Sequence, residues 1–174
     1  EAVEYMRQDA KQLGVPFCLR GFTKEEADKL AQAFGGEFVI KSVRAEWDYL
    51  YRVEDLAQLA GKKYHGKRNH IARFEDAGEW RFEPLKKENL KDCQAMAKVW
   101  YTEHAASGNL SALGDRGGVY NALKNFESLG FTGGVLYQFG QVAGFTIGEP
   151  LNKDTYVVHV EKAYAEIQGA YPML

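Results

Sequence analysis

The stretch GGVLYQFGQVAGFTIGE, which runs from Gly133 to Glu149, decides the fold of this protein. Two runs rich in Val, Ile, Tyr and Phe flank the pair Phe139-Gly140, and these residue types favour strands. Glycine readily adopts the positive φ of a tight turn, so the stretch predicts two antiparallel strands joined at Phe139-Gly140. A similar run, TYVVHVEKA at 155–163, predicts a third strand.

Helical patterns and shorter extended runs surround these strands. Apolar residues spaced by three and four predict helices over 1–14, 53–61, 87–105 and 118–129. Thr23 followed by Glu26 is the sequence of a capping box and predicts a further helix over 23–34. Extended runs predict strands over 15–22, 37–52 and 80–85. The mixture predicts an α+β fold with an antiparallel sheet at its core. We expect three tryptophans at periodic apolar positions to lie in that core: Trp47, Trp80 and Trp100.

The composition is typical of a globular protein, and the net charge is close to zero. The chain has 174 residues, of which 45% are hydrophobic, and its net charge of −2 requires neither a nucleic acid nor a membrane as partner. Its two cysteines, Cys18 and Cys93, are far apart and outside any CxxC motif, which indicates free thiols in a reducing compartment. No apolar run approaches the ~20 residues of a membrane span. We therefore expect a cytoplasmic location, or a peripheral one at the inner face of the membrane.

Positive charge is concentrated in the segment GKKYHGKRNH, from Gly61 to His70, which contains no acid. Helical spacing would let Tyr64 and Ile71 anchor the segment while Lys63, Lys67 and Arg68 face an anion. The alternative is a solvated helix face with acidic residues nearby in space. No spacing of the histidines supports a metal site. The anion-binding candidates are Lys62, Lys63, Tyr64, His65, Lys67, Arg68 and Asn69.

Candidate proton-transfer groups lie on the third strand and beside it. Alternation places His159 and Glu161 on the same face of the strand, and Glu149 ends the neighbouring strand. A histidine or carboxylate of suitable pKa can take the proton from an attacking amine or hydroxyl, so all three are catalytic candidates. Glu149 can instead bind an amino group as a fixed counter-charge. The alternative is that these residues are partly buried polar groups satisfied by the backbone.

Four segments together carry a family resemblance: DYLYRVEDLAQLAGKKYHGKRNHIARF at 48–74, FTIGEPLN at 145–152, VVHVEKA at 157–163 and IQGAY at 167–171. In this order they resemble a bacterial family of poorly characterised proteins related to the phosphatidylglycerol lysyltransferase C-terminal domain. The resemblance implies two tandem GNAT-like (acyl-CoA N-acyltransferase-like) units, each a mixed, largely antiparallel sheet flanked by helices. On that template, 1–50 is the C-terminal half of a first unit and 51–174 the N-terminal portion of a second, so the chain would be a segment of a longer protein.

The resemblance also implies a chemistry. Lysyltransferases of this kind move an aminoacyl group from aminoacyl-tRNA to a lipid headgroup. The cations at 62–68 would clamp the anionic donor while its ester reaches a groove flanked by Glu149 and His159. In a GNAT unit the turn after the third strand binds the donor's pyrophosphate, and Gln168, Gly169 and Ala170 are a remnant of that turn. Tyr171 and Pro172 depart from the pattern and weigh against acetyl-CoA.

Three functions therefore remain open. The first is an aminoacyltransferase that uses aminoacyl-tRNA, with a lipid headgroup, a peptide or a small amine as acceptor. The second is an N-acyltransferase that uses acyl-CoA. The third is a non-catalytic module of the same fold that binds anions or RNA. No cofactor beyond these donors is implied, and the acyl group and acceptor are not specified by the sequence.

Overall fold

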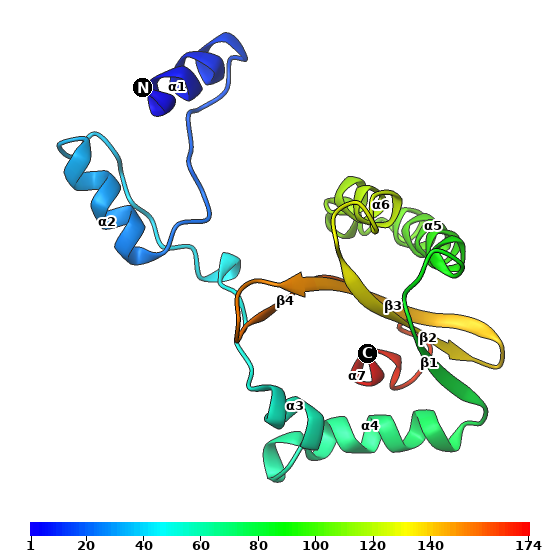
Figure 1. Ribbon diagram of the computed structural model, residues 1–174. Coiled ribbons are helices and arrows are strands. Elements are labelled where there is room, and N and C mark those ends of the chain that lie inside the picture. Colours follow the sequence, from blue (N-terminus) through cyan, green and yellow to red (C-terminus); the bar gives the residue numbers. More distant parts are fainter. The chain divides into compact units, whose positions relative to one another are not determined.

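The computed structural model describes residues 1–110 and 112–174 and divides into two compact units, Glu1–Leu50 and Tyr51–Leu174. The first unit holds α1 (Ala2–Gln12), α2 (Lys24–Ala33) and a short 3-10 helix, η1 (Arg44–Glu46) (Figure 1). That these units are parts of two tandem GNAT-like domains stays a prediction.

Local signals were sufficient for the helices of the first unit but not for its predicted strands. The capping box at α2 is confirmed: Thr23 Oγ1 accepts from the Glu26 N–H, and the Glu26 carboxylate accepts from the Thr23 N–H at 2.8 Å. The strands predicted over 15–22 and 37–52 are wrong, because the described residues there pair with no other strand. No described residue of this unit is buried. Trp47, at 56% exposed, is accordingly not a core residue.

The second unit is built on one antiparallel sheet. Its strands are β1 (Trp80–Pro84), β2 (Thr132–Gln138), β3 (Gln141–Pro150) and β4 (Tyr156–Ala163), in the order β1-β2-β3-β4. Phe139 and Gly140 both have positive φ, 50° and 76°, and join β2 to β3 as the hairpin prediction requires. The α+β fold class is confirmed, with helices flanking the sheet as in a GNAT-like fold.

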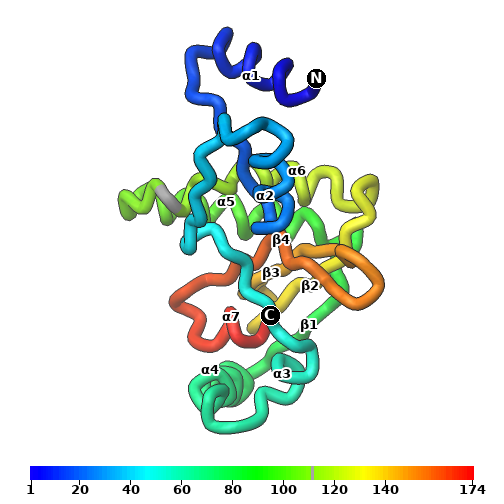
Figure 2. Tube along the Cα trace, turned by 90° about the vertical axis from the view of Figure 1, so that its left-hand side faces the viewer, coloured from blue at the N-terminus to red at the C-terminus, as the bar shows by residue number. Residues whose placement is uncertain are grey.

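Helices cover both faces of this sheet (Figures 1 and 2). One face, here called the α5/α6 face, carries α5 (Leu90–Ala106) and α6 (Arg116–Lys124), connected through η3 (Leu110–Leu113). The other, the α4/α7 face, carries α4 (His65–Asp76) and the short α7 (Ala170–Met173). Before α4 come α3 (Val53–Gln58) and the 3-10 helix η2 (Lys62–Tyr64). The helix predicted over 118–129 is α6, which starts and ends earlier than predicted.

Each face has its own hydrophobic core. Phe145 and Ile147 of β3 pack with α5 and α6, whereas Leu136 of β2 packs with Phe74 of α4. Trp100 on α5 is buried as predicted, but Trp80 is 38% exposed because it starts an edge strand. The sheet therefore separates two cores, and the face on which a side chain lies decides which helices it can contact.

The thiols are both free, as the sequence predicts. Cys18 is exposed, and Cys93 lies on the buried side of α5 in the core. Burial raises the pKa of the Cys93 thiol to about 12, so it stays protonated and unreactive at neutral pH. Within the described residues, no helix is both long enough and apolar enough to cross a bilayer.

Candidate functional site

Glu149 and His159 form a hydrogen-bonded pair at one end of the sheet. His159 Nε2 lies 2.8 Å from Glu149 Oε1, and 39% of each side chain is exposed. The carboxylate can only accept, so Nε2 carries the hydrogen and Nδ1 is left to accept a proton. The Phe131 ring lies 5.4 Å from the imidazole, centroid to centroid, and packs against the core of the α5/α6 face. The pair is thus held in one orientation while remaining open to solvent.

A β-bulge in β4 places this histidine. Ile147 pairs with Val160, and the next residue, Gly148, pairs with Val158, so His159 is an extra residue in the ladder. Glu149 has the same side-chain direction as Ile147, which belongs to the α5/α6 core. The bulge turns His159 toward that same face, where Glu149 can meet it. Sequence alternation across an unbroken strand had not predicted this.

Glu161 lies on the opposite face of the sheet. It pairs with Thr146 of β3, next to Lys162, whose side chain is directed at α5. The prediction that His159 and Glu161 share a face is therefore wrong, and the bulge between them is the reason. Loss of contact with water raises the pKa of Glu161, and the charge of Lys67 on α4 opposes this rise. Glu161 belongs with the basic segment rather than with the histidine.

The basic segment uses part of its charge for local structure. Tyr64 is buried and anchors η2 as predicted. Lys63 Nζ lies 3.1 Å from Asp55 Oδ2, and Arg68 donates to the carbonyl oxygens of Leu59 and Gly61, which close the end of α3. A further hydrogen bond within α4, 3.1 Å long, joins Asn69 Nδ2 and His65 Nε2. Among the described residues, Lys62 and Lys67 make no ion pair within 4.0 Å and remain available to an anion.

The turn after β4 packs against α4. Gly169 has a φ of +90°, and a Cβ at this position would lie 2.2 Å from the carbonyl oxygen of His70. Its missing side chain therefore admits the backbone of α4. A hollow of about 250 Å³ opens beside the turn, lined by His70, Ala165, Ile167, Gln168, Gly169, Tyr171 and Pro172. His70 is the one lining residue that can carry positive charge.

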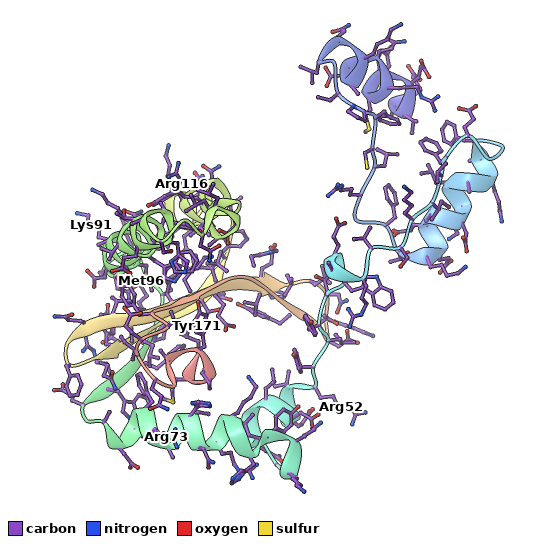
Figure 3. All side chains as sticks on the ribbon, turned by 180° about the vertical axis from the view of Figure 1, so that it is seen from behind. Arg52, Arg73, Lys91, Met96, Arg116 and Tyr171 are labelled. Carbon is purple, nitrogen blue, oxygen red and sulfur yellow. The ribbon has the colours of Figure 1, made fainter. Side chains whose placement is uncertain are left out.

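The predicted site residues consequently fall into two groups, and the prediction that the cations at 62–68 and the groove of Glu149 and His159 line one cleft is wrong. The cations of α4, the Gln168–Ala170 turn and Glu161 lie on the α4/α7 face, whereas Glu149 and His159 lie on the α5/α6 face. Figure 3 shows the two sides through Arg73 on α4 and Arg116 on α6. Strand β4, at an edge of the sheet, is the element that the two groups share. Within the described residues no cluster of three metal-ligating side chains exists.

Comparison with known protein families assigns this chain to one of them. The family model for the phosphatidylglycerol lysyltransferase C-terminal domain matches residues 1–174. The chain belongs to that family. A crystal structure of a conserved protein of unknown function from Bacteroides thetaiotaomicron is 34% identical, with a TM-score of 0.83. The match covers 99% of this chain but only 58% of that protein. No curated protein matches the chain. Membership in the lysyltransferase C-terminal family indicates an acyltransferase-like function.

This member of the lysyltransferase C-terminal family also holds a charged cluster that sequence reasoning missed. Lys162 of β4 is buried, and its Nζ lies 2.8 Å from Asp115 Oδ2 and 4.1 Å above the Trp100 ring. Tyr101 donates to the other Asp115 oxygen at 2.8 Å. The one available signal was a lysine at an inward position of an apolar strand, where charge requires a partner.

Changing Asp115 to alanine is expected to lower the free energy of unfolding by about 2 kcal/mol at pH 7, because Lys162 is left charged and buried. Burial alone would raise the pKa of Asp115, but hydrogen bonds from Lys162 and Tyr101 outweigh it and lower the pKa. Such a carboxyl stabilises the fold above its unfolded pKa of about 4, and this stabilisation is lost as the pH falls through the folded value. Urea unfolding should therefore show a deficit at pH 7 that shrinks below about pH 4.

The matched variant is Lys162→Met, which keeps similar volume and removes the buried charge. We expect its stability at pH 7 to stay within about 1 kcal/mol of the parent, since Asp115 is half exposed and can be solvated. An equal deficit for Asp115→Ala at pH 3 and pH 7 would contradict the assignment of this pair.

Proposed function

We propose that this protein is an aminoacyltransferase in which Glu149 and His159 handle the proton of the attacking acceptor. The observation that carries the proposal is the hydrogen-bonded Glu149–His159 pair on the bulge of an edge strand. The pair is open to solvent and oriented, and the family indicates acyl transfer. A histidine held by a carboxylate is a general arrangement for removing a proton from a nucleophile.

The proposed reaction joins the acceptor to the acyl carbon of an ester donor. The acceptor's amine or hydroxyl attacks the ester carbonyl, and a new N–C or O–C bond forms. His159 Nδ1 takes the proton from the acceptor. The Nε2–H keeps donating to Glu149 Oε1, and the negative charge of this carboxylate stabilises the imidazolium. The ester C–O bond breaks, and the same proton passes to the departing ribose oxygen. No redox partner is needed.

Two features favour aminoacyl-tRNA over acyl-CoA as the donor. A pyrophosphate would need the space next to Gly169, and the backbone of α4 already occupies it. The neighbouring hollow is lined by no lysine or arginine. Lys62 and Lys67 have no ion pair within 4.0 Å in the described part of the chain and can instead contact phosphates of a larger nucleic acid. The acceptor would approach on the α5/α6 face. A donor lying along the outer edge of β4 would reach both faces of the sheet.

The deciding experiment supplies both donors to the full-length protein. Transfer RNAs charged with labelled amino acids and, separately, labelled acyl-CoA are incubated with it, and lipid, peptide and small-amine fractions are counted. We expect label to move from charged tRNA into one fraction. Transfer from acyl-CoA alone would establish the N-acyltransferase alternative, and transfer from neither donor would leave the non-catalytic module.

A further inference from the structure

A second hollow lies on the outer helical layer, and none of the predicted site residues lines it. It has a volume of about 350 Å³ and is formed between α5 and α6. Figure 3 shows Arg116 at this layer. Its lining combines two cations with tyrosine rings and small side chains: Lys98, Tyr101, Thr102, Ala105, Arg116 and Tyr120.

The two cations of this hollow are not neutralised. Neither Lys98 nor Arg116 has an ion pair within 4.0 Å among the described residues, and no acid lines the hollow. The nearest acid along the chain, Asp115, is committed elsewhere, because its two oxygens accept from Tyr101 and Lys162. Two uncompensated positive charges beside one cavity attract an anion.

The start of α6 adds to this positive potential. Asp115 occupies the N-cap position, but its side chain does not cap the helix because Tyr101 and Lys162 hold it. The first turn contains Gly117 and Gly118, around which a Cβ would meet no atom within 4 Å. The amino end of α6, which has no side-chain cap, lies at Arg116, and its dipole has the favourable direction for negative charge.

We propose that the hollow between α5 and α6 binds a phosphate-bearing ligand. Arg116 supplies a planar pair of N–H donors that fits phosphate oxygens, and Lys98 supplies a second point charge. The Tyr120 ring forms an apolar wall against the non-phosphate part of the ligand. This site is separate from the Glu149–His159 pair, and its assignment does not depend on the transfer reaction.

Titration calorimetry of the full-length protein at low salt tests the proposal with inorganic phosphate, glycerol 3-phosphate and adenosine monophosphate as probes. If inorganic phosphate binds with the same affinity as the two larger probes, the hollow is a site for the phosphate group alone. If one larger probe binds more tightly, its organic part makes a second contact. We expect Arg116→Ala and Lys98→Ala each to weaken affinity about tenfold, as loss of one charge-assisted contact does. Arg116→Lys should retain part of the binding.

The matched control is Lys91→Ala, which removes an exposed cation from the other end of the same helix α5 (Figure 3). Its affinity should change less than about twofold, since it does not line the hollow. All four variants alter exposed side chains, and thermal melts verify that each is folded. The proposal is overturned if no probe binds below about 10 mM, or if Lys91→Ala weakens binding as much as Arg116→Ala.

Discussion

Changing His159 to glutamine is expected to lower kcat about 100- to 10,000-fold with little change in the KM of the donor. This is the usual size of a general-base contribution, and glutamine keeps the polar volume while losing the basic nitrogen. Glu149→Gln should lower kcat less, about 10- to 100-fold, because the imidazole remains but its orientation and charge are no longer supported. Steady-state kinetics with the donor identified in the transfer assay measure both variants.

The matched control for the carboxylate is Glu88→Gln, which makes the same chemical change at an exposed position before α5. It should leave kcat within about twofold of the parent, as surface changes usually do. Full turnover in the His159→Gln variant would remove this residue from the mechanism. Equal losses in all three variants would point to a general effect of charge rather than to the pair.

Changing Gly169 to valine is expected to destabilise the second unit by roughly 3 kcal/mol and to lower its Tm by roughly 10 °C. The left-handed backbone contributes 1–2 kcal/mol of this estimate, and the clash of the new side chain with the His70 carbonyl of α4 contributes roughly as much. Thermal melts followed by circular dichroism provide the measurement. A loss of this size would identify Gly169 as the contact point between α7 and α4.

Gly66→Ala is the control for this prediction. Gly66 lies inside α4, and a Cβ there would meet no atom within 4 Å. Alanine should therefore raise stability by about 0.5–1 kcal/mol through helix propensity alone. If Gly169→Val kept the parental Tm while weakening donor binding, the glycine would serve the ligand rather than the packing of α4.

The parts of the fold that could be predicted from the sequence are those fixed by neighbours along the chain. The hairpin at Phe139-Gly140 depends on one turn, and α5 depends on a repeated stripe that includes Cys93 and Trp100. The extended runs of the first unit also have strand-forming composition, as at Val39 and Ile40, yet both side chains are exposed. A strand exists only when another strand pairs with it, and composition does not reveal the partner.

The candidate site was predictable in its residues but not in its grouping. Glu149 and His159 were identified from their types and positions, and the structure brings them to 2.8 Å. Glu161 was grouped with them because alternation in an unbroken strand puts residues two apart on the same face. The sequence does not reveal the bulge that breaks this alternation. Lys63 and Arg68 were assigned to an anion, although Asp55 and backbone carbonyls hold them. These contacts link residues whose proximity depends on how the chain folds.

The bulge at His159 divides β4 into two parts with different roles, one that carries the candidate site and one that packs in the interior. Beyond it, Lys162 and Ala163 are committed to the interior, where Trp100 Nε1 donates to the Ala163 carbonyl at 3.1 Å. Before it, Tyr156 and Val158 are exposed and Val157 is half-buried, so side chains there can be exchanged with less effect on that interior. Related proteins could therefore alter their reactive end by substitution while the buried end keeps the sheet intact. Deletion of Val158 would remove the bulge, so that His159 would pair with Gly148 and point to the α4/α7 face.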